Sequence, residues 1–205
     1  MAQEHSEGHP KPDETVLQEA GDLKVLDESG KELPFRDLFN TEGRQVIVFI
    51  RHFFCGHCED YVRQLTKHFP PKDLERIKSS SALAIIGCGE PSVIAGYKQR
   101  TGCPFPIYCD PSRALYAKLG MTKSLSLGDR KPEYVQSSVL GGTLKSMSNM
   151  VSSGLGFLKG GDYSQNGGEW VFVDGNLEWC HRMQNTRDHA EISELGSVLG
   201  FGVMN

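Results

Sequence analysis

The sequence has no long apolar run and no excess of basic residues. None of its 205 residues falls in an apolar stretch of about 18, the length that crosses a bilayer. The segment Met1 to Pro12 is polar and charged where a secretory signal needs an apolar core. Its 22 Lys and Arg stand against 26 Asp and Glu, a formal net charge of -4. We therefore expect a cytoplasmic protein whose partners are neither nucleic acids nor membranes.

A permanent disulfide framework is not expected either. A reducing compartment keeps thiols free, so any disulfide among the six cysteines should be transient. With 38% hydrophobic and 23% charged residues, the chain has the composition of an ordinary globular protein. We expect residues 1–20 to be a flexible lead-in and residues 21–205 to form one domain, with an insertion around 121–168 and no internal repeat. The six cysteines are Cys55, Cys58, Cys88, Cys103, Cys109 and Cys180.

The middle of the chain predicts a strand, a helix and a second strand. Residues 46–50, Val-Ile-Val-Phe-Ile, form an unbroken β-branched and aromatic run typical of a strand buried on both faces. One helical stripe follows at Tyr61, Val62, Leu65 and Phe69, and prolines end it. Residues 83–86 predict a second buried strand, which the intervening helix makes parallel to the first.

The second half adds the elements that complete a fold. We expect helices over 91–102 and after Asp110-Pro111, a less regular helix over 133–151, and a hairpin of residues 170–173 and 177–183 around Asp174-Gly175-Asn176. A capping box, Asp188 to Glu191, then predicts the start of a closing helix. The expected fold class is α/β and thioredoxin-like: a central mixed sheet flanked by helices, with a C-terminal hairpin and closing helix.

A pair of cysteines stands where the first strand meets its helix, in Cys55-Gly56-His57-Cys58. A helix start offers unpaired N–H groups and the positive end of the helix dipole, and both favour a thiolate at the first cysteine. The second cysteine lies one turn on, where it can displace a mixed disulfide. The spacing thus predicts Cys55 as the attacking group and Cys58 as the resolving one.

The neighbours of the pair act in opposite directions. An imidazolium at His57 would stabilise the Cys55 thiolate, whereas Glu59 and Asp60 in the first helical turn would raise the pKa of a nearby thiol. The sequence therefore does not decide whether these neighbours together raise or lower the redox potential of the pair. A zinc half-site is the alternative reading of two cysteines at this spacing, but no second C-x-x-C or H-x-x-x-H pair supplies further ligands. We expect no metal and no other cofactor.

The run from Val46 to Cys58, with Arg51 a few residues before the pair, resembles the active-site strand and loop of peroxiredoxin-like proteins of the AhpC/TSA (alkyl hydroperoxide reductase/thiol-specific antioxidant) superfamily, and most closely its peroxiredoxin-like 2 group. The resemblance extends to residues 108–120, to residues 161–168, and to His181 and Asp188-His189 beyond them. It implies a thioredoxin fold and thiol-dependent reduction of a small-molecule peroxide or disulfide, with thioredoxin or glutathione as electron donor.

The resemblance also ranks the remaining candidates. Arg51 is the cation available to stabilise a developing oxyanion, and the alternative is an arginine that points outward from a strand end. His52 and His181 are weaker candidates for the site. Cys88, Cys103 and Cys109 are expected in the core, although one of them could pair with Cys55 during turnover. Cys180 and His181 alternate on one strand, so only one of them can face the site.

Two further functions stay open at this point. One is a dedicated enzyme that acts on a single small metabolite or endoperoxide with the same dithiol. The other is a redox sensor or binding module, in which the pair switches a surface and turns over no substrate.

Overall fold

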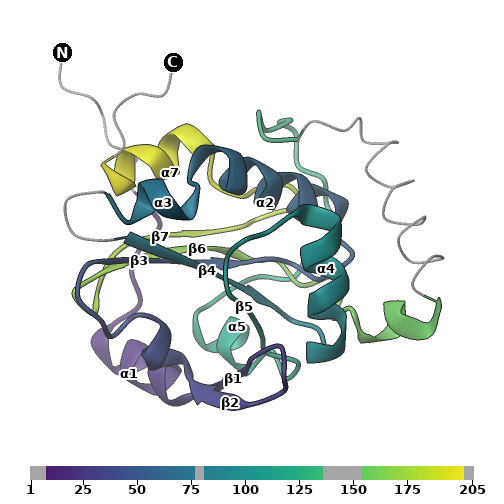
Figure 1. The fold of residues 1–205 in the computed structure, drawn as a ribbon, viewed down its shortest axis with the longest axis horizontal. Helices are drawn as coiled ribbons and strands as arrows, with labels where there is room; N and C mark the ends of the chain where they lie inside the picture. The colour runs from purple at the N-terminus through teal and green to yellow at the C-terminus, as the bar shows by residue number, and fades with distance from the viewer. Residues whose placement is uncertain (1–7, 77–80, 136–153, 201–205) are drawn as a thin grey trace.

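The computed structural model describes residues 8–76, 81–135 and 154–200, where one seven-stranded sheet is covered on both faces by helices (Figure 1). The strand order is β2-β1-β5-β4-β3-β6-β7. Within those ranges no helix is long and apolar enough to span a membrane. The strands are β1 (Lys24–Leu26), β2 (Glu32–Pro34), β3 (Arg44–Phe49), β4 (Ser81–Gly87), β5 (Ile107–Cys109), β6 (Gly168–Val173) and β7 (Asn176–Arg182). The α-helices are α1 (Glu14–Asp22), α2 (Gly56–His68), α3 (Pro71–Leu74), α4 (Ile94–Thr101), α5 (Ala114–Lys118) and α7 (Ile192–Leu199), and the 3-10 turns are η1 (Phe35–Leu38), η2 (Pro91–Val93) and η3 (Gly154–Lys159).

The strand β3 lies at the centre of the sheet, as its unbroken apolar run predicts. It pairs in parallel with β4 and antiparallel with β6, so that Val48 lies between Ile85 and Glu169. Strands in this position are buried on both faces, which explains why apolar residues follow one another without alternation. The two parallel strands and the mixed sheet confirm the expected fold class.

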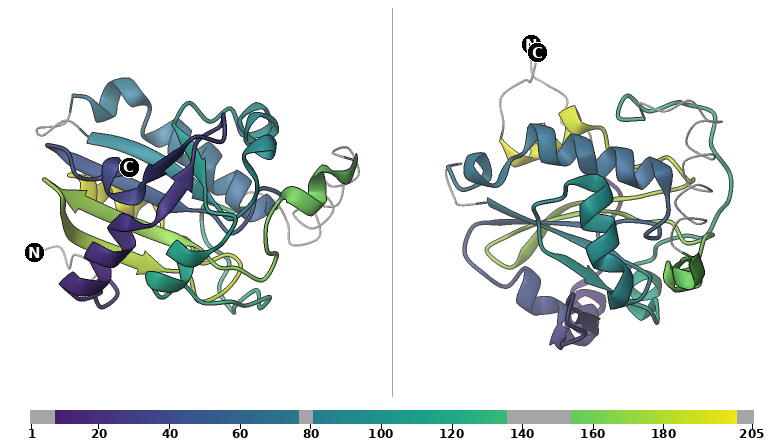
Figure 2. Two further views of the ribbon diagram at one scale, coloured as in Figure 1. Left: turned by 90° about the horizontal axis from the view of Figure 1, so that it is seen from below. Right: turned by 45° about the vertical axis from the view of Figure 1, so that its right-hand side comes forward.

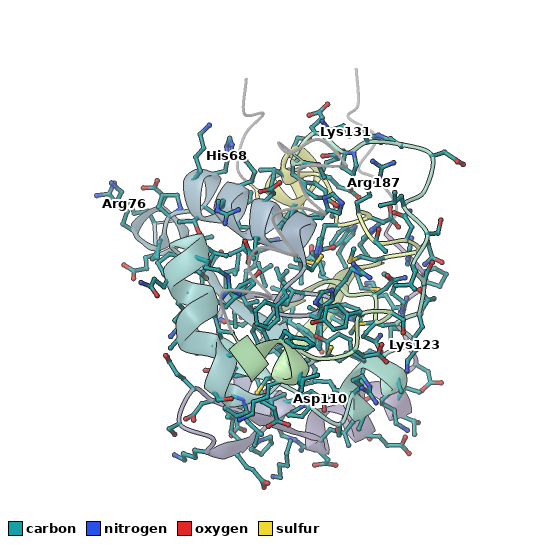
Figure 3. All side chains as sticks on the ribbon, turned by 90° about the vertical axis from the view of Figure 1, so that its right-hand side faces the viewer. His68, Arg76, Asp110, Lys123, Lys131 and Arg187 are labelled. Atoms are coloured by element: carbon teal, nitrogen blue, oxygen red, sulfur yellow. The ribbon has the colours of Figure 1, made fainter. Side chains whose placement is uncertain are left out.

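The side chains of β3 divide the core into two layers. Val46 and Val48 pack with residues of α2, α4 and α7, whereas Ile47 and Phe49 pack with residues of α1, α5 and η1. Figure 2 (left) shows α1 and α5 in front of the strands when the molecule is seen from below. His68 at the end of α2 and Asp110 before α5 accordingly lie at opposite ends of Figure 3. The dithiol thus belongs to the layer of α2 and α7.

Two local predictions in the second half are confirmed. The strands β6 and β7 form the expected antiparallel hairpin, with Asp174 and Gly175 in the left-handed conformation that its tight turn requires. A helix over 91–102 is present as η2 and α4, and Gly102 ends it at a positive φ of 67°.

Three predictions differ from the structure. Residues 14–20 belong to α1, which Asp13 caps and which buries Ala20, so the expected lead-in does not extend to residue 20. The closing helix begins at Ile192 and not at a capping box, because the chain from Asp188 to Glu191 is not helical and its polar groups bond to other segments. The expected helix over 133–151 lies, beyond Val135, outside the described residues.

Candidate dithiol site

The first cysteine of the pair caps the helix that follows it. Cys55 is the N-cap of α2, and its Sγ accepts a hydrogen bond from the Cys58 amide at 3.4 Å. This amide is one of the unpaired N–H groups at the helix start, and it aligns with the positive end of the helix dipole. The local sequence therefore places Cys55 where a thiolate is favoured.

A guanidinium group completes the surroundings of Cys55. Arg51 follows β3, is only 5% exposed, and has Nη1 3.5 Å from Cys55 Sγ, while its Nη2 donates to the Tyr163 carbonyl oxygen. The structure therefore excludes the outward orientation considered for this arginine. A buried cation this close to sulfur favours the charged form of the thiol.

The two thiols have pKa values shifted in opposite directions. Burial raises the pKa of Cys55, but the hydrogen bond from the Cys58 thiol, the charge of Arg51, the Cys58 amide and His57 outweigh it and hold the pKa well below its usual range. Burial and the neighbouring Cys55 sulfur raise the pKa of Cys58 well above its usual range. The reduced site is thus a thiolate at Cys55 that accepts a hydrogen bond from a thiol at Cys58.

His57 contributes less than the sequence suggests. Its burial lowers its pKa, although the Cys55 thiolate and Asp60 act in the opposite direction. The pKa of His57 therefore lies below its ordinary value, and His57 contributes less than Arg51 to the lowered pKa of Cys55. Arg51 is the cation that contacts Cys55 among the described residues.

The acidic residues at the start of α2 are paired with arginines. Glu59 is fully buried, and it accepts from Arg100 Nε at 2.9 Å and from Arg63 Nη2 at 3.1 Å. Asp60 accepts from Arg63 Nη1 at 3.0 Å. Since each carboxylate has a cationic partner, their expected effect on the dithiol is largely compensated. Arg100 also donates to the Phe53 carbonyl oxygen, which ties α4 to the loop before Cys55.

A histidine that the sequence did not assign to the site contacts Cys58, and a glutamate contacts that histidine. His189 Nε2 lies 3.5 Å from Cys58 Sγ, and His189 Nδ1 lies 2.5 Å from Oε1 of Glu169. Both side chains have zero exposure. A glutamate between Gly168 and Trp170 in an otherwise apolar strand is the sequence signal for this pair, because an ionisable residue in a buried strand needs a partner.

The two weaker histidine candidates lie elsewhere. His52 is buried against the Tyr163 ring, with ring centroids 4.4 Å apart, and burial lowers its pKa to about 3. His181 shares the α2 face of the sheet with Glu169, but its Nε2 lies 2.6 Å from the Asp188 carbonyl oxygen. The structure therefore brings Cys55, Cys58, Arg51 and His57 together but places neither weaker candidate against a sulfur of the pair.

The remaining four cysteines are buried thiols, as expected for Cys88, Cys103 and Cys109. Burial raises the pKa of each of them: to about 12 for Cys88, to about 11 for Cys103, to about 12 for Cys109, and upward for Cys180. No group of three or more His, Cys, Asp or Glu in the described ranges has the geometry to hold a metal ion. The described part of the chain therefore offers no zinc ligand set around the dithiol.

Comparisons with known proteins show which family the chain belongs to. The profile of the family described as AhpC/TSA antioxidant enzyme matches residues 64–185. Peroxiredoxin-like 2C of Mus musculus is 35% identical over 187 residues, which cover 90% of this chain and 80% of the mouse protein. The chain belongs to the AhpC/TSA family. Within this family, Peroxiredoxin-like 2C of Homo sapiens is 32% identical over 198 residues, covering 96% of this chain and 85% of the human protein.

Solved structures that share the fold of this AhpC/TSA family member are distant from it in sequence. A peroxiredoxin Q variant from Xanthomonas campestris superposes with a TM-score of 0.55 at 12% identity, covering 95% of this chain and 96% of that one. A peroxiredoxin-like protein from Aquifex aeolicus gives 0.54 at 9% identity, covering 94% and 85%. These likenesses establish the thioredoxin-like fold, and family membership supports thiol-based redox chemistry in general.

Proposed function

We propose that this protein is a thiol-dependent oxidoreductase that reduces a peroxide or a small disulfide with Cys55 as nucleophile and Cys58 as resolving thiol. The observation that carries the proposal is the position of Cys55 at the N-cap of α2, where its Sγ accepts from the Cys58 amide and lies 3.5 Å from Arg51 Nη1; this arrangement lowers the pKa of Cys55, while the pKa of Cys58 is raised. A thiolate is the attacking species in such reactions, and a second thiol that stays protonated does not compete with the first for the substrate. The two cysteines therefore have distinct roles before any substrate arrives.

The reaction would proceed in two displacements. The Cys55 thiolate attacks one atom of an O–O or S–S bond, which gives a sulfenic acid or a mixed disulfide and releases an alcohol, water or thiol. Cys58 then attacks the Cys55 sulfur, forms the Cys55–Cys58 disulfide and releases water or the second thiol. Two electrons from thioredoxin or glutathione would restore the dithiol in a reducing compartment such as the cytoplasm.

Arg51 would serve the first displacement in two ways. Its guanidinium is within 3.5 Å of the nucleophilic sulfur, so it stabilises the thiolate before attack. During attack on a peroxide, negative charge develops on the departing oxygen, and a preorganised buried cation stabilises that charge more strongly than water does. The 3% exposure of Cys55 supports a small substrate over a folded protein.

Turnover of hydrogen peroxide and of hydroxyethyl disulfide, each with a thioredoxin or a glutathione system, tests the proposal. We expect Cys55→Ser to abolish turnover. Cys58→Ser should react once and then stop, with the adduct on Cys55 visible by mass spectrometry. Cys180→Ser is the matched control, because this thiol lies in the other layer of the core, and it should turn over as wild type.

The outcomes separate the functions left open by the sequence. Absence of turnover by wild type with both substrates would overturn the proposal and leave the single-metabolite enzyme and the redox sensor. Turnover that survives in Cys55→Ser would refute the assignment of the nucleophile.

A further inference from the structure

The resolving thiol lies at one end of a chain of three buried groups. Cys58 Sγ is 3.5 Å from Nε2 of His189, and Nδ1 of the same ring is 2.5 Å from Oε1 of Glu169. The three groups come from α2, from the irregular segment before α7, and from β6, which lies between β3 and the edge strand β7. An imidazole in this position connects the sulfur to the carboxyl through its two nitrogens.

The ring is held in place from several sides. It stacks on Tyr61 of α2, with centroids 4.2 Å apart and an interplanar angle of 5°. The His189 amide donates to the Tyr134 hydroxyl at 3.0 Å, and the Ala190 amide donates to Oε2 of Glu169 at 3.2 Å. Each partner of the 2.5 Å contact is therefore held by a hydrogen bond in which a backbone amide is the donor.

We propose that His189 and Glu169 form a proton relay for the resolving step, in which His189 Nε2 takes the proton of the Cys58 thiol while His189 Nδ1 passes a proton to Glu169. The inference rests on the proposed function, since it describes how the second displacement starts. His189 contacts a reacting atom and is a catalytic residue, whereas Glu169 acts through it as a positioning residue and proton acceptor.

The proton balance of the relay closes within the site. At the start the thiol carries one proton, Nδ1 carries one, and Glu169 is ionised. After transfer, Nε2 and Glu169 carry the two protons and Cys58 is a thiolate. The thiolate forms the S–S bond with Cys55, the bond from Cys55 to its oxygen or sulfur substituent breaks, and the departing group takes up one proton. The relay then holds one proton more than at the start, and it returns to its starting state when it gives up one proton, which balances the proton taken up by the departing group.

The electrostatics agree with this route. Burial lowers the pKa of His189 to about 3 and raises the pKa of Glu169 to about 8. The ring thus stays neutral throughout, because only its tautomer changes, and the raised pKa of the accepting carboxyl lies closer to that of the Cys58 thiol than an ordinary carboxyl pKa would. The titratable and charged groups that face the His189–Glu169 pair are His181 of β7, Asp188, Glu194 of α7, Tyr61 and Tyr134, and Cys55 and Arg51 beside α2.

Single-turnover kinetics with 2,2'-dithiodipyridine test the relay. Attack by Cys55 releases one coloured thione and attack by Cys58 releases a second, so each displacement has its own absorbance phase. In wild type we expect the rate constant of the second phase to rise about tenfold per pH unit and to level off near pH 8. Both Glu169→Gln and His189→Gln should slow it at pH 8 by about 100-fold and remove the plateau, with the first phase unchanged.

Matched substitutions at histidine and glutamate control for general effects. His68→Gln lies at the far end of α2 (Figure 3), and Glu178→Gln lies on β7 at the surface. Both should keep the wild-type second phase. No first phase in wild type would overturn the proposed function. Two outcomes with a normal first phase would overturn the relay alone. One is a second phase in wild type whose rate constant shows no plateau below pH 9, and the other is an unchanged second phase in both relay variants.

Discussion

Replacement of Glu169 by glutamine isolates the energetic effect of the carboxyl buried in β6. Glutamine has the same length, and its oxygen can accept from the Ala190 amide while its amide group donates to His189. It thus reproduces the hydrogen bonds of the protonated carboxyl. Since glutamine cannot ionise, only the wild type carries the cost of a buried negative charge.

The size of the effect follows from the pKa of the carboxyl. Burial raises the pKa of Glu169 from 4.5 to about 8. Between these values the folded chain holds a proton that the unfolded chain has lost, so the stability of wild type falls as the pH rises through this window and is level above it. At about 1.4 kcal/mol per pH unit, the full loss is about 5 kcal/mol.

Urea unfolding of both proteins under reducing conditions, from pH 5 to pH 9, measures this loss. All other titrating groups are shared and cancel in the difference between the two free energies of unfolding. We expect nearly equal stabilities at pH 5 and a glutamine variant more stable by several kcal/mol at pH 9. A difference that does not change with pH would refute the reasoning, because it would mean that Glu169 titrates alike in the folded and unfolded chains.

Two further predictions concern the arginines around the dithiol. Arg51→Ala should raise the pKa of the Cys55 thiol by about 1 to 3 pH units, measured by the thiolate absorbance and the alkylation rate, whereas Arg51→Lys should raise it less; an unchanged titration would contradict the role given to this cation. Arg100→Met leaves buried Glu59 with one arginine fewer and should lower the free energy of unfolding by roughly 3 kcal/mol in chemical denaturation. Adding Glu59→Gln to Arg100→Met should recover part of that loss, and no recovery would count against the pairing.

Those parts of the fold that depend on short-range signals were predictable from the sequence. An unbroken apolar run predicts β3, and the turn residues Asp174 and Gly175 predict the hairpin. The spacing of Cys55 and Cys58 predicts their position at a helix start. Each signal lies within a few residues of the structure it specifies. Local preference and tertiary packing agree at these positions.

The missed features depend on contacts between distant segments. A capping-box pattern at Asp188 favours an earlier helix start, but the non-helical chain there lets His189 reach Glu169 and Cys58, and these buried contacts outweigh a local cap. The inward orientation of Arg51 depends on the carbonyl group of Tyr163, which is 112 residues away. No periodicity in the sequence carries that information.

The histidine that contacts Cys58 lies 131 residues further along the chain. At a synthesis rate of about 5 to 20 residues per second, the ribosome needs roughly 10 s between the two. During that interval the dithiol and α2 have been made, while the strand that carries Glu169 and the segment that carries His189 have not. A nascent chain therefore presents its cysteines before it can bury them, and this interval is when they are most open to oxidation by the wrong partner.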